Sequence, residues 1–134
     1  MMKEQLISFK TAKLAKEVGF KIECEWAVHE DGYDHYRDFI GDEYLFSLDC
    51  MEDAFENTEE EHYLAPTQSL MQKWLREKHG IMVDVIPDYH DGWWFSCRIL
   101  FFNGDFLCEN NGDTYEEALE AGLHEALKKV KNES

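Results

Sequence analysis

Long hydrophobic runs are missing from this sequence of 134 residues. No apolar stretch reaches the roughly 18 residues that a membrane-spanning helix needs. The opening letters "MMKEQLISFK" also lack the apolar segment of a secretory signal peptide. We therefore expect a cytoplasmic protein without a membrane partner.

Cysteine is sparse and forms no paired motif. The four cysteines, Cys24, Cys50, Cys97 and Cys108, stand far apart with no C-x-x-C pair. In a reducing compartment such residues remain thiols. Two of them stand in strand-like alternations, where a cysteine behaves as a small buried hydrophobe.

Positive charge is scarce too. The 13 Lys and Arg residues are outnumbered by 29 Asp and Glu residues, which gives a formal net charge of −16. A phosphate backbone would meet net repulsion, whereas nucleic-acid-binding proteins usually carry a basic surface. The composition therefore argues against a nucleic acid as partner, although a large net charge also serves solubility alone.

Motifs for catalysis and metal binding are missing as well. There is no glycine-rich phosphate loop, and Cys97 has no histidine at a spacing typical of nucleophilic catalysis. The acidic residues and histidines from His29 to His35 offer ligands for a cation, but their spacing fits neither an EF-hand nor a zinc site. We expect a solvated loop there, and a protein that is not an enzyme and has no catalytic residues, cofactor or metal.

The sequence does contain enough apolar side chains for one folded domain. Hydrophobic residues make up 44% of the chain, aromatic residues make up 14%, and only two residues are proline. A chain of this size and composition can bury a core that offsets its conformational entropy. We expect a single domain over residues 1–134, with a helix-strand extension at 1–28, an acidic insertion at 29–62 and a core at 63–134.

The extension is predicted to be a helix followed by a strand. Ser8 can cap a helix through "FKTAKLAKEV", in which apolar residues recur with the helical period, and Gly19 supplies a left-handed exit. In "FKIECEWAV", residues 20–28, apolar residues alternate with mostly charged ones. This alternation is typical of a strand with one buried face.

The acidic insertion is the unusual part of the sequence. It contains 13 acidic residues and one basic residue, Arg37, and so contributes −12 to the net charge. Aromatic residues scattered through it indicate a long loop that packs partly against the rest of the domain. A short strand at "YLFSL", residues 44–48, and a helical turn at residues 51–56 are expected within it.

The core is predicted to contain a helix, three antiparallel strands and a second helix. The first helix starts at Pro66 or Thr67 and ends before Gly80. "IMVDVI" then reads as a strand that Pro87 stops, and "WWFSCRILFF" and "DFLCE" are strands joined by an Asn-Gly hairpin turn. Consecutive strands of this kind are expected to form a meander.

The last helix is predicted to begin at Asp113 or Thr114, where Thr114 and Glu117 have the spacing of a capping box. Its sequence indicates a wide apolar stripe. The stripe consists of Tyr115, Ala118, Leu119, Gly122, Leu123, Ala126, Leu127 and Val130.

The order of elements from Pro66 to Val130 resembles that of the double-stranded-RNA-binding domain, and "TYEEALEAGLHEAL" is similar to the terminal helix of that family. The matching packing positions are Thr114, Ala118, Ala121, Ala126 and Leu127. The resemblance implies an α+β fold, an antiparallel sheet with helices packed on one face. However, Tyr115, Glu116 and Leu119 stand where the family has phosphate-gripping lysines, and "DYHDG" lacks its Gly-Pro-x-His loop.

Two further resemblances concern partners. The letters "GDTYEEAL", residues 112–119, resemble the helix opening of the HicB antitoxin domain, an acidic family that neutralises an RNA-cleaving toxin. This resemblance implies a protein partner, but the family's Leu-Pro-Gly-Cys turn and an appended DNA-binding domain are absent from the sequence. The segments "SFKTAKLAKEVGF" and "YLAPTQSLMQKWLREKHGI" resemble uncharacterised small proteins of phages and integrated elements of intestinal bacteria, which imply no known activity.

One sheet face is predicted to carry a surface for a partner. If Cys97 and Ile99 face the helices, then Trp94 and its same-parity neighbours form an unusually apolar open face. The N-terminal helix and strand, a second copy in a homodimer, or a host or phage protein would cover it. With the acidic start of the last helix, the candidate surface comprises Trp94, Leu100, Phe102, Glu116, Glu117 and Glu120.

These patterns together predict a non-enzymatic binding or regulatory protein of a phage or mobile element that acts through protein contacts. The most specific version of this prediction is a protein whose acidic surface imitates the charge of a nucleic acid and thereby inhibits an enzyme that acts on nucleic acids. The alternatives are a HicB-like inhibitor and an RNA-binding module that uses Lys73, Arg76 and Lys78.

Overall fold

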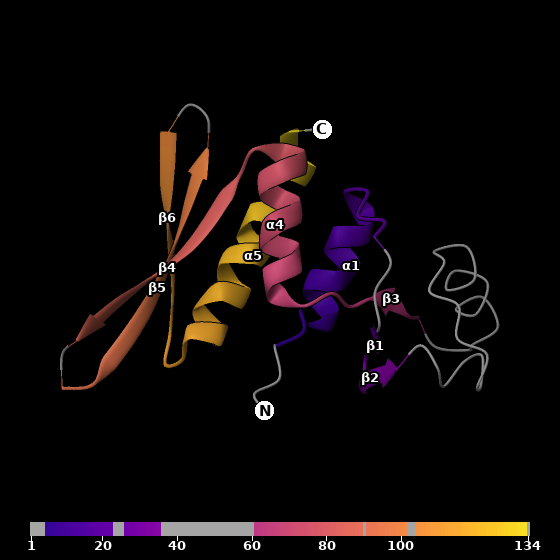
Figure 1. The fold of residues 1–134 in the computed structure, drawn as a ribbon, viewed down its shortest axis with the longest axis horizontal. Helices are drawn as coiled ribbons and strands as arrows, with labels where there is room; N and C mark the ends of the chain where they lie inside the picture. The colour runs from indigo at the N-terminus through magenta and orange to yellow at the C-terminus, as the bar shows by residue number, and fades with distance from the viewer. Residues whose placement is uncertain (1–4, 23–25, 36–60, 90, 102–103, 134) are drawn as a thin grey trace. The chain divides into compact units, whose positions relative to one another are not determined.

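The computed structural model describes residues 5–22, 26–35, 61–89, 91–101 and 104–133 (Figure 1). These residues form an α+β structure of three helices and two small antiparallel sheets, which confirms the predicted fold class. The chain divides into two compact units. Leu6–Pro66 is the amino-terminal unit, and Met1–Gln5 with Thr67–Ser134 is the carboxy-terminal unit. The expectation of a single domain stays a prediction.

The amino-terminal unit combines one helix with a three-stranded sheet. Its elements are α1 (Phe9–Glu17), β1 (Trp26–His29), β2 (Gly32–His35) and β3 (Tyr63–Leu64), and the antiparallel strand order is β2-β1-β3. The predicted cap is confirmed, because the Thr11 amide donates to Ser8 Oγ over 3.3 Å. Gly19 has φ +94°, the left-handed exit expected after the helix.

The strand predicted at residues 20–28 begins only at Trp26 among the described residues. Phe20 does not start it, because the Phe20 amide still donates to the Ala15 carbonyl of α1 over 2.9 Å. Regular structure also continues past His29, since β1 turns directly into β2 and Val28 pairs with Tyr33. The expected strand at residues 44–48 and helical turn at residues 51–56 lie outside the described residues.

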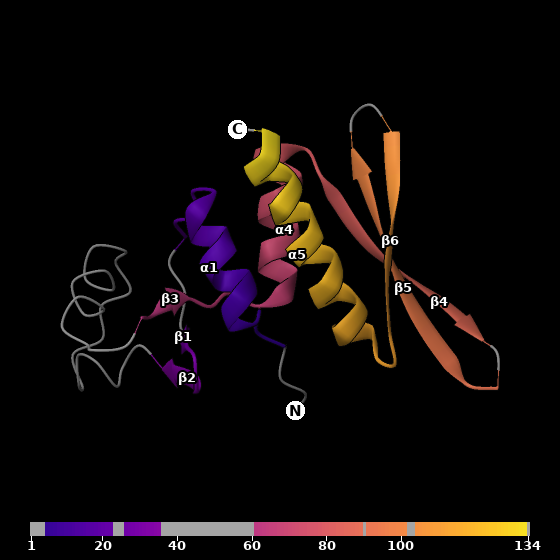
Figure 2. The same cartoon turned by 180° about the vertical axis from the view of Figure 1, so that it is seen from behind.

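The carboxy-terminal unit has the predicted order of helix, three strands and helix. Its elements are α4 (Gln68–His79), β4 (Met82–Tyr89), β5 (Trp93–Phe101), β6 (Gly104–Gly112) and α5 (Tyr115–Glu133). The strands form an antiparallel sheet in the order β4-β5-β6. Helix α5 packs against all three strands and against α4, which also contacts β4 (Figure 2).

Both ends of α4 follow the local sequence. Thr67 is the N-cap and its Oγ1 accepts the Leu70 amide over 3.2 Å, while Gly80 closes the helix at φ +66°. Met71 and Leu75 are fully buried, as the apolar stripe of this helix requires. The capping residues and the helical period of the apolar residues together therefore identify this helix from the sequence.

Pro87 does not stop β4, which runs on to Tyr89 with Pro87 opposite Phe95. The reason is the strand order, since β4 borders the sheet among the described residues. An edge strand tolerates proline because one side of its backbone needs no ladder hydrogen bond. Strand β6 is also longer than the predicted "DFLCE", and its pairing with β5 is irregular between Ser96 and Arg98.

The start of α5 yields a stability prediction. The Glu117 amide donates to Thr114 Oγ1 and the Asp113 amide donates to Glu117 Oε2, both over 3.1 Å. Replacing Thr114 by alanine removes the first bond and is expected to lower the free energy of unfolding by about 1 kcal/mol. Urea denaturation measures this loss. Thr114→Ser keeps the hydroxyl, so an equal loss in that variant would contradict the capping role.

A second prediction concerns pH. Burial lowers the pKa of His79, with a smaller contribution from the charge of Lys78, and the ring stacks edge-on against Trp74 at 4.8 Å. With the folded pKa below the ordinary 6.5, the unfolded state binds the proton first, so stability falls as the pH drops from 6.5 through the lowered value. Urea denaturation between neutral and mildly acidic pH is expected to show a smaller loss for His79→Gln. Equal pH dependence would refute this role.

Candidate functional site

One face of the carboxy-terminal sheet belongs to the core. Cys97 and Ile99 are fully buried and Val83 nearly so, and register places Val83 opposite Ile99. A Cβ atom added to Gly122 of α5 would lie 2.8 Å from Val83 Cγ1 and 2.9 Å from Cys97 Cβ. Helix and sheet therefore meet at van der Waals distance on the face that the alternation predicted.

The opposite face carries two of the predicted surface residues. Cross-strand pairing places Met82 opposite Leu100 and Asp88 opposite Trp94, and side chains paired in this way share a face. Trp94 is 49% exposed and Met82 44% exposed, while Leu100 is half-buried. Phe102, the third predicted apolar residue, lies outside the described residues.

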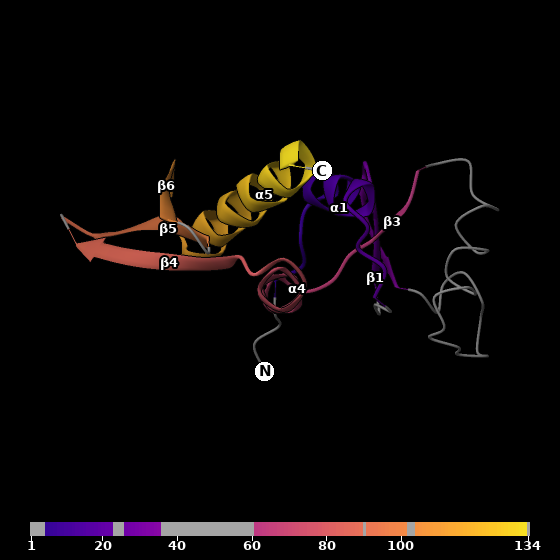
Figure 3. The same ribbon diagram turned by 90° about the horizontal axis from the view of Figure 1, so that it is seen from above.

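The closed end of the β4–β5 hairpin carries further exposed rings. Tyr89 is 62% exposed and Trp93 is 60% exposed, and their ring centroids lie 5.3 Å apart in an edge-to-face arrangement. This pair lies on the face that α5 covers further along, but the hairpin projects beyond the helices here (Figures 1, 2 and 3). The rings therefore remain open to solvent.

A fourth exposed ring comes from α5. Tyr115 is 46% exposed and packs edge-on against Phe95, with ring centroids 6.4 Å apart. It was predicted as part of the buried stripe, but its position at the first turn leaves it at the margin of the sheet. We call Tyr89, Trp93, Trp94 and Tyr115 the hairpin aromatic patch.

The three predicted glutamates have different surroundings. Glu117 caps α5 through the Asp113 amide. Glu120 Oε1 accepts a hydrogen bond from Gln68 Nε2 over 3.3 Å, and the same nitrogen donates to the Glu116 carbonyl over 2.9 Å. Two of the three carboxylates thus take part in internal hydrogen bonds, and the Glu116 side chain is exposed next to Tyr115.

Negative charge surrounds the hairpin aromatic patch. Asp88 pairs with Trp94 across the hairpin, and Asp91 lies in its turn with φ +55°. Asp113 directly follows Gly112, which pairs with Phe95. The patch therefore has acidic neighbours and extends over both faces of the hairpin end, since Trp94 lies on the face opposite Tyr89 and Trp93.

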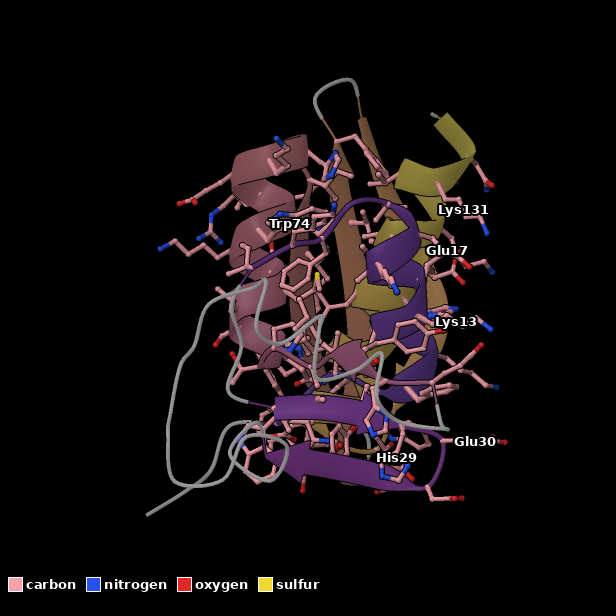
Figure 4. All side chains as sticks on the ribbon, turned by 90° about the vertical axis from the view of Figure 1, so that its right-hand side faces the viewer. Lys13, Glu17, His29, Glu30, Trp74 and Lys131 are labelled. Carbon is pink, nitrogen blue, oxygen red and sulfur yellow. The ribbon has the colours of Figure 1, made fainter. Side chains whose placement is uncertain are left out.

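Two other places in the amino-terminal unit are the β1–β2 turn and an apolar pocket. Figure 4 shows His29 and Glu30 at the β1–β2 turn, with the Glu30 side chain pointing outward. No three side chains of His, Cys, Asp or Glu gather there, or elsewhere among the described residues, in a way that would hold a metal ion. An apolar pocket of the amino-terminal unit includes Ala12, Phe20 and Lys16, whose ammonium lies 5.4 Å from the Tyr63 ring centroid. The lining also includes Lys21 and His62.

The basic residues proposed for RNA binding are exposed on α4. Lys73, Arg76 and Lys78 all have exposed side chains.

None of the helices in the described residues combines the length and apolar character that crossing a bilayer requires.

No protein-family model, curated protein or solved structure matches this chain.

Sequence reasoning found part of the hairpin aromatic patch and missed the rest. The alternation of β5 singled out Trp94, whereas Trp93 was not among the predicted surface residues. Tyr89 was read as part of a turn. The signal that would have found them is strand length, because β4 and β5 extend four residues beyond the Val85–Cys97 pair toward their turn.

Proposed function

We propose that the protein is a non-enzymatic, cytoplasmic binding protein that acts through protein–protein contacts, with the hairpin aromatic patch as its contact surface. The observation that carries this proposal is the exposure of four large aromatic side chains at one end of the sheet. Exposed aromatic groups of this size mark interaction surfaces more often than chance, and Trp and Tyr dominate binding energy at protein interfaces. A regulatory role in a phage or mobile element rests on the sequence resemblance alone.

The test is affinity capture from an extract of an intestinal bacterium, using three forms of the full chain as bait. Wild type and Met82→Ala are expected to retain the same protein, whereas Trp93→Ala/Trp94→Ala is expected to lose it. Met82 is a suitable control because it is an exposed apolar side chain at the other end of β4. Equal recovery by all three baits would refute the assignment of the surface.

RNA binding is the second candidate, since Lys73, Arg76 and Lys78 are exposed on one helix. Fluorescence anisotropy with duplex RNA separates the two functions. Our proposal predicts no binding at physiological salt, because the chain carries a formal charge of −16. Salt-sensitive binding that disappears in Lys73→Ala/Arg76→Ala would favour RNA instead.

A further inference from the structure

Each exposed ring of the hairpin aromatic patch has a carboxylate close to it in the chain or across the hairpin. Asp88 pairs with Trp94 across the hairpin, and their side chains share the face opposite Tyr89 and Trp93. Asp91 is two residues from Trp93, and Glu116 follows Tyr115. Asp88 is held in place locally, because its Oδ1 accepts the Tyr89 amide over 2.8 Å. Rings and carboxylates thus occur together at this end of the sheet.

Positive charge is almost absent from the same region of the chain. Between residues 80 and 127 the sequence has ten acidic residues and one Lys or Arg, Arg98. The Arg98 guanidinium already lies against Asp84, with Nη2 3.7 Å from Oδ2. It is also four residues from Trp94 along β5, roughly 13 Å at the usual rise of a strand. The stretch from residue 80 to residue 127 is therefore strongly acidic, and its one Lys or Arg is engaged with Asp84.

We infer that the occupant of the hairpin aromatic patch is an arginine-bearing segment of a basic partner polypeptide. The inference rests on the proposed function and names the chemistry of the partner. A guanidinium stacks on the face of an indole or phenol ring, and its planar fork donates paired hydrogen bonds to a carboxylate. Asp88 opposite Trp94 supplies both halves of that recognition on one face of the hairpin, and Asp91 adds negative charge in the turn.

The same charges argue against the other occupants. A second copy of this chain would bring an identical acidic surface, and two acidic surfaces repel each other. Single-stranded nucleic acid can stack its bases on exposed rings, but its phosphates would meet the same carboxylates. A purely apolar segment would cover the rings but would bring no positive charge to the acidic side chains that it desolvates.

The test uses the full chain and fluorescein-labelled synthetic peptides. An arginine–glycine–serine repeat is compared with versions in which lysine, glutamine or glutamate replaces arginine, by fluorescence anisotropy at several salt concentrations. The arginine peptide is expected to bind tightest, the lysine peptide several-fold more weakly, and the glutamate peptide not at all. Binding is expected to weaken as salt rises.

Two double variants then remove the aspartate charges and the tryptophan rings separately. Asp88→Asn/Asp91→Asn keeps the shape, since asparagine also accepts the Tyr89 amide and tolerates the positive φ of position 91. This variant, and Trp93→Ala/Trp94→Ala, are each expected to weaken arginine-peptide binding about tenfold. Glu30→Gln/Glu77→Gln removes the same net charge from exposed positions elsewhere and is expected to change affinity less than about twofold.

The outcomes separate the inference from the proposed function. Equal binding of the arginine and glutamine peptides, lost only in Trp93→Ala/Trp94→Ala, would overturn the inference and leave the proposed function standing. Equal weakening by the aspartate pair and by the glutamate control would also overturn it, because non-specific attraction would then explain the binding. Absence of binding by every peptide, together with concentration-dependent dimerisation through Trp93 and Trp94, would overturn both.

Discussion

Leu123→Ala is expected to lower the free energy of unfolding by about 3 kcal/mol, within the range measured for buried leucines. Leu123 has no exposed surface and belongs to α5, the helix that contacts all three strands of the carboxy-terminal sheet. Removing its isobutyl group leaves a cavity that a helix braced against three strands cannot close. Urea denaturation followed by circular dichroism measures the loss.

Leu70→Ala is the matched control for this prediction. It makes the same chemical change at a half-buried position of α4. The loss there is expected to be about 1 kcal/mol, because less apolar surface returns to water. If Leu123→Ala cost no more than Leu70→Ala, α5 would not be the central element of this unit.

Gly112→Ala is expected to cost about 2 to 3 kcal/mol through overpacking. A Cβ atom at this position would lie 2.8 Å from the Ala118 amide nitrogen and 2.8 Å from Glu117 Cβ. It would also lie 3.1 Å from the Thr114 carbonyl oxygen. These atoms belong to the first turn of α5, so relief requires the helix start to move away from β6.

Gly80→Ala is the control that distinguishes the steric clash at Gly112 from the cost of placing alanine at a glycine with positive φ. Gly80 has φ +66° and open space around the position of a Cβ atom, so alanine there costs only the left-handed conformation, about 1 to 2 kcal/mol. Thermal or urea unfolding is expected to rank Gly112→Ala as the more damaging variant. The reverse order would show that the end of β6 can shift to admit a methyl group.

The local rules of helix formation predicted much of the fold. Ser8, Thr67 and Thr114 cap helices, and Gly19 and Gly80 close them, because these effects depend on neighbours a few residues away. Strand ends were less predictable. Phe20 is still engaged by α1, and Pro87 is tolerated inside β4 because of the strand order, which no local pattern reveals.

The candidate surface was only partly accessible to sequence reasoning for a related reason. Alternation correctly placed Cys97 and Ile99 on the covered face of β5. It says nothing about where α5 stops covering that face, and this limit leaves Trp93 exposed. Similarly, Glu120 reads as a surface charge until its hydrogen bond to Gln68 of α4 is known.

The most direct test of the protein-binding role is an NMR titration that follows the indole N–H signals of the four tryptophans. Trp93 and Trp94 are exposed in the hairpin aromatic patch, whereas Trp74 is buried in α4 and Trp26 begins β1 of the other unit. On addition of the arginine peptide, the signals of Trp93 and Trp94 are expected to shift to saturation while those of Trp26 and Trp74 stay in place. Saturable shifts confined to Trp26 or Trp74 would contradict the proposed surface, and no shift in any indole signal would contradict the arginine-bearing occupant.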